Sequence, residues 1–554
     1  MSLETIDKWF LREVMRWRCG AAIAWSVLCV PVMSALYITL ANLQPLHPLT
    51  CIADTSSCIL SSSFISSVTV IMIVTGCFQF YTKNTYSVLP TVSISRVSHL
   101  AQLLIPSILT HIALCTGSGL VVAWIMTCLL GDRYAGLSTQ QHGSTYTVNE
   151  YHIFLVLYGG YTGLMFTVSH YIHHGNLVVF PHTQQGKFAE ARCQLIPTAR
   201  AALGHVLWQI KYFYLLYFLS GEIFQDFIAS TLSLKYGPGP RLDSLYGLLD
   251  VGLFWQALLV GVFIQLTWTL GALLYKLYNT EGYEFPISTM FETFQNKCLV
   301  DALTCTKLPL LQALGFQDLT KLSQHSYVRR RELFSLSQPG GHPHNWNKIS
   351  SVCLSVINEL SDSVQEVNWK ILASAPVRQN NNTEKAGVTT THSNGETTVE
   401  GENKSTVRER IINGIKKRKV LTFFTWESTE SRSKSLFVSA YVQIWAVEAL
   451  AWLVKVSVTE DLFGVVQMSL SDIISAVLSL HENVEKHLKL TGGVARRGQR
   501  DTMATTETLY KHQLQTALKS SVYMIVNTFG SQLLEVGLSP DTEKKLHQFL
   551  EYRE

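Results

Sequence analysis

The feature that most constrains this chain is a series of apolar blocks, each about as long as a bilayer is thick. A spanning helix needs roughly 20 mostly apolar residues. The first half of the chain holds six such blocks, at about residues 20–40, 59–80, 103–130, 151–171, 203–224 and 248–274. Charged residues make up only 15% of the 554 residues, against about 25% in an average soluble protein. The sequence therefore predicts an all-α fold that begins with a six-span transmembrane domain over residues 20–275.

Basic residues in the connecting segments predict which ends of the spans face the cytosol. They gather before the first block, in the second and fourth loops, and after the sixth block: Lys8, Arg12, Arg16, Arg18, Lys83, Arg96, Lys187, Arg192, Arg200 and Lys276. The alternate loops offer only Arg133, Lys235 and Arg241. This bias predicts that both termini and the whole second half of the chain lie on the cytosolic side.

The segment before the first block, residues 1–19, has two interpretations. Apolar residues recur there at helical spacing, from Leu3 to Trp17, while basic residues fall on the other positions. Such a pattern suits an amphipathic helix in the headgroup region. It equally suits a cytosolic extension of the first span, and this second interpretation is the one we favour.

The second half of the chain is typical of a cytosolic helical domain with a polar insert. Amphipathic runs recur over residues 276–372 and again over 409–554. Between them, residues 373–408 are rich in Asn, Thr, Gly and Glu and have almost no large apolar side chains. Because such a segment cannot bury enough apolar surface to offset its chain entropy, we predict a disordered linker.

The run Ser435–Val458 is apolar enough to suggest a seventh span. Glu448 lies in the middle of it, where a lone carboxylate would be costly in a bilayer. We therefore expect a buried central helix of the cytosolic domain.

No signature of catalysis or of cofactor binding accompanies this organisation. The chain has no phosphate-binding glycine loop, no His-Glu-x-x-His, no Gly-x-Ser-x-Gly and no Cys-x-x-Cys. His170, His173 and His174 resemble one histidine box of the membrane di-iron enzymes, but the further boxes of that family are missing, so we expect interfacial histidines and no metal. Lys211, inside the fifth block, suits a transport path or a side chain that reaches the membrane surface, and we favour the latter.

Two pairs of small residues in the membrane half bear on packing. Cys51 and Cys58 fall in the first lumenal loop, a compartment in which disulfides persist. The sequence leaves two alternatives, a disulfide between them or two free thiols. Gly159 and Gly163 form a Gly-x-x-x-Gly pair in the fourth block. This spacing predicts close packing inside the bundle or against another membrane protein.

A basic and aromatic cluster follows the polar insert, and it is a candidate membrane-surface segment. It comprises Ile411, Ile412, Ile415, Lys416, Lys417, Arg418, Lys419, Phe423, Phe424 and Trp426. Adjacent cations flanked by apolar side chains suit an anionic bilayer surface. A nuclear localisation patch and a solvated helix face are the alternatives.

Several stretches along the chain resemble one known family. They include "RCGAAIAWSVLCVP", "NEYH" at Asn149–His152, "EFP" at Glu284–Pro286, Phe316–Leu319, "SQPGGHPHNW", "WAVEAL", "TEDLFGVVQ" and the C-terminal "LHQFLEYRE". Together they resemble the transmembrane nucleoporin of the nuclear-division-cycle (NDC) family, the polytopic membrane anchor of the nuclear pore complex. The resemblance implies a structural, non-enzymatic protein of the nuclear envelope, without a cofactor and without direct nucleic-acid contact. It also implies membrane lipids, Aladin, membrane-binding linker and inner-ring nucleoporins and other pore membrane proteins as partners.

The family stretch around His-Pro-His contains Gln338, Pro339, Gly340, Gly341, His342, Pro343, His344, Asn345 and Trp346. Two histidines separated by one proline point in diverging directions, and no further ligand is nearby, so a metal is not expected. We predict a rigid loop fixed by its prolines, with Trp346 packed on the helical domain. A polytopic lipid-modifying enzyme of the ER or nuclear envelope and a transporter stay open as alternatives to the anchor.

Overall fold

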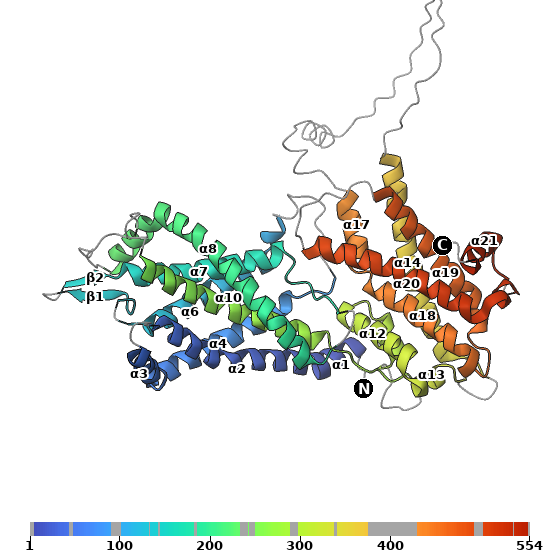
Figure 1. Ribbon diagram of the computed structural model, residues 1–554, viewed down its shortest axis with the longest axis horizontal. Helices are drawn as coiled ribbons and strands as arrows, with labels where there is room; N and C mark the ends of the chain where they lie inside the picture. Colours follow the sequence, from blue (N-terminus) through green and yellow to red (C-terminus); the bar gives the residue numbers. More distant parts are fainter. Residues whose placement is uncertain are drawn as a thin grey trace, which may run out of the picture.

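The computed structural model describes residues 5–43, 48–89, 101–131, 133–141, 145–181, 185–232, 242, 250–287, 297–336, 341–374, 429–491, 502–535 and 537–551. In this part of the chain the regular secondary structure is helical apart from one small β-hairpin and two residues of an isolated bridge. A helix bundle lies on the left of Figure 1 and a second helical domain on the right, with α1 between them.

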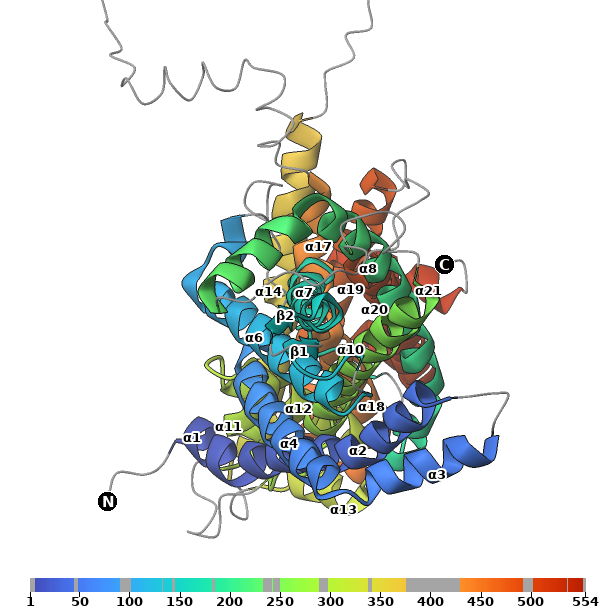
Figure 2. The ribbon, with the colours of Figure 1, turned by 90° about the vertical axis from the view of Figure 1, so that its left-hand side faces the viewer.

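The bundle is built from long helices that run side by side along the molecule (Figure 1). Its elements are α1 (Ile6–Phe10), the π-helical turn η1 (Leu11–Met15), α2 (Arg16–Ala41), α3 (Pro48–Ile59), α4 (Ser62–Thr82), the 3-10 turn η2 (Lys83–Thr85), α6 (Pro106–Cys128), strands β1 (Ser138–Gln141) and β2 (Thr145–Val148), α7 (Glu150–Ile172), α8 (Lys187–Leu232) and α10 (Val251–Asn279). Helix α10 contacts α2, α7 and α8, and α6 lies between α4 and α7. In the view along the bundle, α3 lies at the edge of the end that faces away from the second domain (lower right in Figure 2).

The second domain is a helical bundle around α18. Its elements are α11 (Leu299–Thr304), α12 (Pro309–His325), α13 (Tyr327–Leu333), α14 (His344–Ser374), α17 (Thr429–Phe437), α18 (Tyr441–Glu460), the 3-10 turn η4 (Gln467–Ser469), α19 (Leu470–Thr491), α20 (Thr502–Phe529), the 3-10 turn η5 (Gly530–Glu535) and α21 (Pro540–Leu550). Helix α18 is packed by α12, α14 and α20, and most of its apolar side chains are fully buried.

Length and composition make six helical segments of the described chain candidates for crossing a membrane, and this set differs from the predicted set at two positions. Five of them match predicted spans: Ile6–Ala41, Ser62–Thr85, Pro106–Cys128, Glu150–Ile172 and Val251–Asn279. The predicted span 203–224 lies within α8, which packs against α7 and α10 but is too polar to qualify. The sixth candidate is α18, which the structure places inside the second domain.

The N-terminal segment continues the first span without a break. Helix α1, η1 and α2 follow each other directly from Ile6 to Ala41. Ile6 and Phe10 are buried in the core of the second domain rather than facing outward. The segment is therefore a helical extension of the first span whose apolar side chains Ile6 and Phe10 pack in protein, and its cytosolic side stays a prediction.

Glycines allow α6 and α7 to touch through their backbones. A Cβ atom added to Gly159 would collide with Ala123 Cβ and with the carbonyl of Gly119, and one added to Gly163 would collide with the carbonyl of Cys115. The Gly-x-x-x-Gly pair thus packs within the bundle, which was one of its two predicted roles.

Polar side chains join further helices of the bundle. Ser26 on α2 donates a hydrogen bond to Gln79 on α4, with 2.5 Å between the oxygens. Gly271 on α10 faces the same Gln79 side chain. A side-chain hydrogen bond between spans stabilises such a bundle by about 0.6–2 kcal/mol.

A buried polar cluster ties together the helices on either side of the 375–428 gap in the described chain. His487 Nδ1 lies 2.8 Å from Asn368 Oδ1, and His487 Nε2 lies 3.0 Å from the Ser433 hydroxyl. Glu507 and Lys511 on α20 also bond to Ser433. Burial, with a smaller contribution from Lys511, lowers the pKa of His487 to about 4.

Substituting Gly159→Leu is expected to destabilise the bundle by roughly 2–3 kcal/mol or more, because the new side chain has no space between α6 and α7. Thermal unfolding in detergent, followed by a dye that reacts with exposed cysteines, measures the change. Gly117→Leu is the matched control, since nothing lies near a Cβ at that position. Equal unfolding temperatures for the two variants would contradict the close packing.

The His487 cluster predicts a loss of stability in acid. The folded pKa, about 4, lies below the ordinary 6.5, so the unfolded state binds more protons between these values. The free energy of unfolding therefore falls as the pH drops from about 6.5 towards 4. His487→Gln keeps a donor and an acceptor without this titration and should flatten that pH dependence. His512→Gln, at an exposed position, should leave it unchanged. Identical pH curves for His487→Gln and the parent chain would refute this assignment.

Candidate functional site at the junction of bundle and domain

The site begins with a short connector, residues 280–287, between the last bundle helix and the second domain. Helix α10 ends at Asn279, and Thr280 bonds back to the Lys276 carbonyl. From Gly282 to Ile287 the chain has no regular secondary structure. Its backbone groups are therefore available to side chains from both sides.

The membrane bundle holds the beginning of the connector. Arg18 on α2 donates to the carbonyls of Glu281 and Gly282, at 2.6 and 3.0 Å. Lys187, the first residue of α8, forms an ion pair with the Glu281 carboxylate at 2.7 Å. These contacts fix the connector to the ends of two bundle helices.

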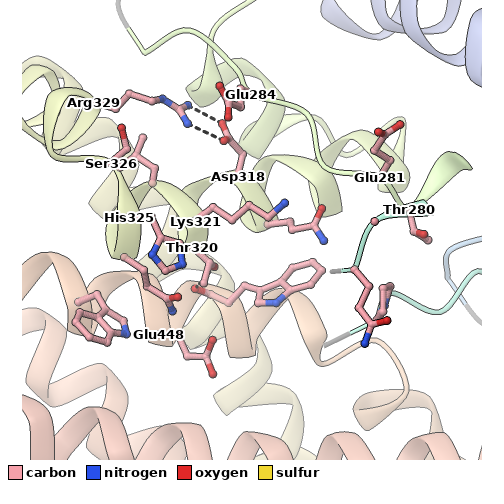
Figure 3. Close-up of a pocket in the computed structure, with 18 of the residues that line it drawn as sticks. Thr280, Glu281, Glu284, Asp318, Thr320, Lys321, His325, Ser326, Arg329 and Glu448 are labelled. Carbon is pink, nitrogen blue, oxygen red and sulfur yellow. Dashed lines mark hydrogen bonds and ion pairs between the residues drawn. The ribbon is translucent and has the colours of Figure 1, made fainter. Parts of the chain in front are cut away.

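The second domain holds the end of the connector through a buried ion pair. Arg329 donates to both oxygens of Asp318, at 2.8 and 2.7 Å, and to the Phe285 carbonyl at 2.7 Å. Asp318 also accepts the Phe285 N–H at 2.9 Å, so both backbone groups of Phe285 are bound (Figure 3 shows the ion pair). Burial acts to lower the pKa of Arg329, but its hydrogen bonds to Asp318 and that carboxylate's charge outweigh burial and raise the pKa.

Aromatic side chains seal the connector against α1. The ring of Phe10 lies 6.0 Å from that of Tyr283 and 6.3 Å from that of Phe285, and the Tyr283 and Phe285 rings are 4.7 Å apart. Phe10 and Phe285 are almost fully buried. These offset and edge contacts add to the burial of apolar area, so the N-terminal helix, the connector and α12 share one core.

Two further connections from the same end of the bundle reach the second domain. Ser87, after η2, pairs with the backbone of the segment after α7, where Val178 donates to Ser87 at 2.9 Å. Phe180 then packs on α18, with its ring 5.4 Å from Tyr441 and 5.5 Å from Trp445. The connections that the basic residues predicted to lie on one side thus converge on the second domain.

A cleft of about 1020 Å³ opens beside the connector. It lies between the start of α8, the end of α10, the connector, and helices α12, α18 and α20. In Figure 3, Lys321 and His325 lie on α12, and Glu448 lies on the neighbouring helix α18. Burial lowers the pKa of Lys321, while the charges of Asp318, Glu284 and Glu281 act against that change.

The structure brings the described part of the His-Pro-His stretch to the start of α14. Gln338, Pro339 and Gly340 lie outside the described residues. His344 begins α14, and its N–H bonds to the His342 carbonyl at 2.8 Å. Trp346 is fully buried and donates from Nε1 to the Ser469 hydroxyl at 3.0 Å. The tryptophan therefore packs in the helical domain as predicted.

The other sequence-predicted sites lie away from the junction or outside the described chain. The candidate membrane-surface residues, from Ile411 to Trp426, all fall within 375–428, which is not described, as does nearly all of the predicted linker 373–408. His173 caps the C-terminal end of α7. Among the described residues no three His, Cys, Asp or Glu side chains gather in a way that would hold a metal ion.

The bridge between Cys51 and Cys58 that the sequence left open does not form in this structure. Both thiols are free, and both residues lie on α3. Seven residues of helix separate their Cα atoms by about 10.5 Å, whereas a disulfide requires less than about 7 Å. The regular helix thus excludes the bond.

The family stretch "NEYH" organises the end of the bundle that faces away from the second domain. Asn149 caps α7 and donates to the carbonyls of Arg133 and Gly136, at 3.2 and 3.1 Å. Glu150 accepts the N–H of Leu242 at 2.8 Å, and His152 Nδ1 lies 2.9 Å from the Tyr134 carbonyl. The motif fixes the chain between α6 and α7 and makes no contact with the junction.

The sequence pointed to only some of the residues that form the junction. Phe285 and Asp318 each fall in a family stretch, "EFP" and "FQDL", but nothing in their spacing of 33 residues indicates that they meet. Arg18 likewise begins the family stretch "RCGAAIAWSVLCVP", whereas Arg329 carried no functional signal beyond its charge. Sequence reasoning could have found these residues only by predicting which distant positions come into contact in the folded chain.

The fold and the junction define a multi-pass membrane protein whose C-terminal helical domain is fixed to one end of its bundle. Comparison with known proteins gives the family: the model described as "Nucleoporin protein Ndc1-Nup" matches residues 13–413 and 388–547. The chain belongs to this nucleoporin family.

Relatives of similar extent accompany that match. Nucleoporin NDC1 of Xenopus laevis is 30% identical over 654 aligned residues, which cover 98% of this chain and 99% of the frog protein. Nucleoporin NDC1 of Homo sapiens is 28% identical, with 98% of each chain covered. Nucleoporin Ndc1 of Drosophila melanogaster is 23% identical over 86% of this chain and 89% of the fly protein.

Asp318→Asn is expected to loosen the junction by roughly 3 kcal/mol, because it leaves the partly buried Arg329 without its counter-charge. Limited proteolysis should then cut the connector between Glu281 and Pro286 faster, while fragments from within either helical part appear at the parent rate. Asp362→Asn, at an exposed position on α14, is the control. Unchanged cleavage in Asp318→Asn would show that the ion pair does not hold the connector.

Proposed function

We propose that this protein anchors scaffold nucleoporins to the pore membrane of the nuclear pore complex. The bundle retains the chain in the bilayer, and the C-terminal domain presents binding surfaces to soluble pore proteins. The observation that carries this proposal is the junction: four separate connections from one end of the bundle, at residues 6–18, 86–88, 177–181 and 280–287, contact the second domain. A junction with several connections transmits mechanical load from the second domain to the membrane bundle, and an anchor requires this.

The two termini face the cytosol and the pore in this proposal. The connections that contact the second domain are also those with more basic residues, including Arg18, Lys83 and Lys187. Positive residues favour the cytosolic side. The opposite end of the bundle, with α3 and the β1–β2 hairpin, then faces the lumen of the nuclear envelope.

The partners that we propose follow from the family. They are Aladin, the membrane-binding linker and inner-ring nucleoporins, and other pore membrane proteins, bound without catalysis or a cofactor. We further propose that the cluster around Lys416, Lys417, Arg418 and Lys419 binds anionic lipid, at about 1 kcal/mol for each basic residue near the surface. The loop before Trp346 acts as a rigid entry to α14.

Proximity labelling tests both the location and the orientation. A labelling enzyme fused to the C-terminus of the full chain should mark scaffold nucleoporins, and imaging should show a punctate nuclear rim. The same enzyme inserted between β1 and β2 should mark lumenal proteins instead. A diffuse reticular distribution, or scaffold proteins marked only from the hairpin, would contradict the proposed anchor.

A further inference from the structure

The cleft beside the connector is a cavity of the described chain that the anchoring role leaves unused. Its walls come from both halves of the molecule, including Lys187 and Glu190 of α8, Leu277 of α10, and Ser520 and Met524 of α20. At about 1020 Å³ it is as large as the upper range of ligand pockets, roughly 300–1,000 Å³. The cleft has room for several side chains of a bound segment.

The charges that line the cleft favour a cation. The carboxylates are Glu190, Glu281, Glu284, Asp318 and Glu448, and the lysine and arginine side chains are Lys187, Lys321 and Arg329. Two of these cations already pair with carboxylates of the cleft, Lys187 with Glu281 and Arg329 with Asp318. The lining therefore carries more negative than positive charge, and a low-dielectric wall strengthens the resulting field.

A buried acceptor in the same cleft points independently to a ligand. Gln317 lines the cleft with only 5% of its surface exposed. Its Oε1 atom has no hydrogen-bond partner. A buried acceptor without a partner costs about 1–3 kcal/mol, and an N–H donor from an occupant would remove that cost.

Two indole rings complete the recognition chemistry. Trp445 and Trp452 line the cleft from α18, about one helical turn before and one helical turn after Glu448. Indole faces attract ammonium and guanidinium groups within about 6 Å. Glu448 itself is the carboxylate that made α18 an unsuitable membrane span, and its place in the cleft gives it a role.

We propose that the cleft binds lysine or arginine side chains of a basic segment in a partner protein. A guanidinium or ammonium group supplies N–H donors to Gln317 Oε1 and to the carboxylates. An anionic lipid headgroup is repelled by the same lining. This inference rests on the proposed function, because it names the chemistry by which a soluble partner engages the anchor.

The test uses the full chain in detergent and three probes in solution. The probes are the peptide Gly-Ala-Arg-Ala-Lys-Ala-Arg-Ala-Gly, its counterpart with glutamate at the three basic positions, and glycerol 3-phosphate as an anionic headgroup. Titration calorimetry should show saturable binding of the basic peptide alone. Glu448→Gln should weaken that binding roughly tenfold, as expected for loss of a charge-assisted contact. Glu359→Gln, an exposed carboxylate on α14, should leave it unchanged.

A second variant separates folding from recognition. Ser520→Trp fills the cleft without changing its charge, and monodisperse elution with an unchanged unfolding temperature shows that each variant is folded. Loss of peptide binding in Ser520→Trp, together with the weaker binding by Glu448→Gln, supports the proposal. Binding that survives Ser520→Trp, equal binding of the glutamate peptide, or binding of glycerol 3-phosphate alone overturns it. None of these outcomes alters rim localisation of the parent chain, so failure here and failure of the anchoring role are distinguishable.

Discussion

The buried pair between Asp318 and Arg329 is the interaction on which the rest of the architecture depends. It binds both backbone groups of Phe285, and thereby fixes the one covalent link between the last described bundle helix and the second domain. Breaking a buried pair by removing one partner costs about 3–5 kcal/mol, whereas a lone exposed pair is worth under about 1 kcal/mol. Position, rather than the number of ion pairs, gives this one its importance.

Around that pair, the burial of apolar side chains extends a single covalent link into an interface between the bundle and the second domain. Phe10, Phe180 and Phe285 come from three different connections, yet they belong to one hydrophobic core with α12 and α18. An interface formed by several chain segments resists bending more than a single linker does, because each segment adds its own constraint. The anchoring role follows from this geometry: a load on the domain reaches the bilayer through several helices at once.

Much of the membrane half could be predicted because bilayer thickness imposes a length and a composition on each helix. The prediction was weaker for two helices in which length and composition do not agree with the location. Helix α8 packs in the bundle although Lys211 and Glu222 make it polar. Helix α18 is apolar although it belongs to the second domain. Hydropathy cannot distinguish burial in protein from burial in lipid. For α18, the carboxylate of Glu448 in the middle of the helix made that distinction, because a lone charge is costly in a bilayer. Local patterns also could not pair Asp318 with Phe285 or place Gln317 in a cleft, because these facts depend on contacts between segments that are distant in the sequence.

The central claim is that bundle and domain form one rigid unit through the connector. Double electron–electron resonance on the full chain in lipid nanodiscs measures this directly, with spin labels at two exposed positions, Phe80 at the end of α4 and Tyr327 on α13. The account predicts a single narrow distance distribution, the same at low and high ionic strength, because the joining pair is buried. A broad or two-peaked distribution would mean that the domain swings on a flexible tether, and it would contradict the account.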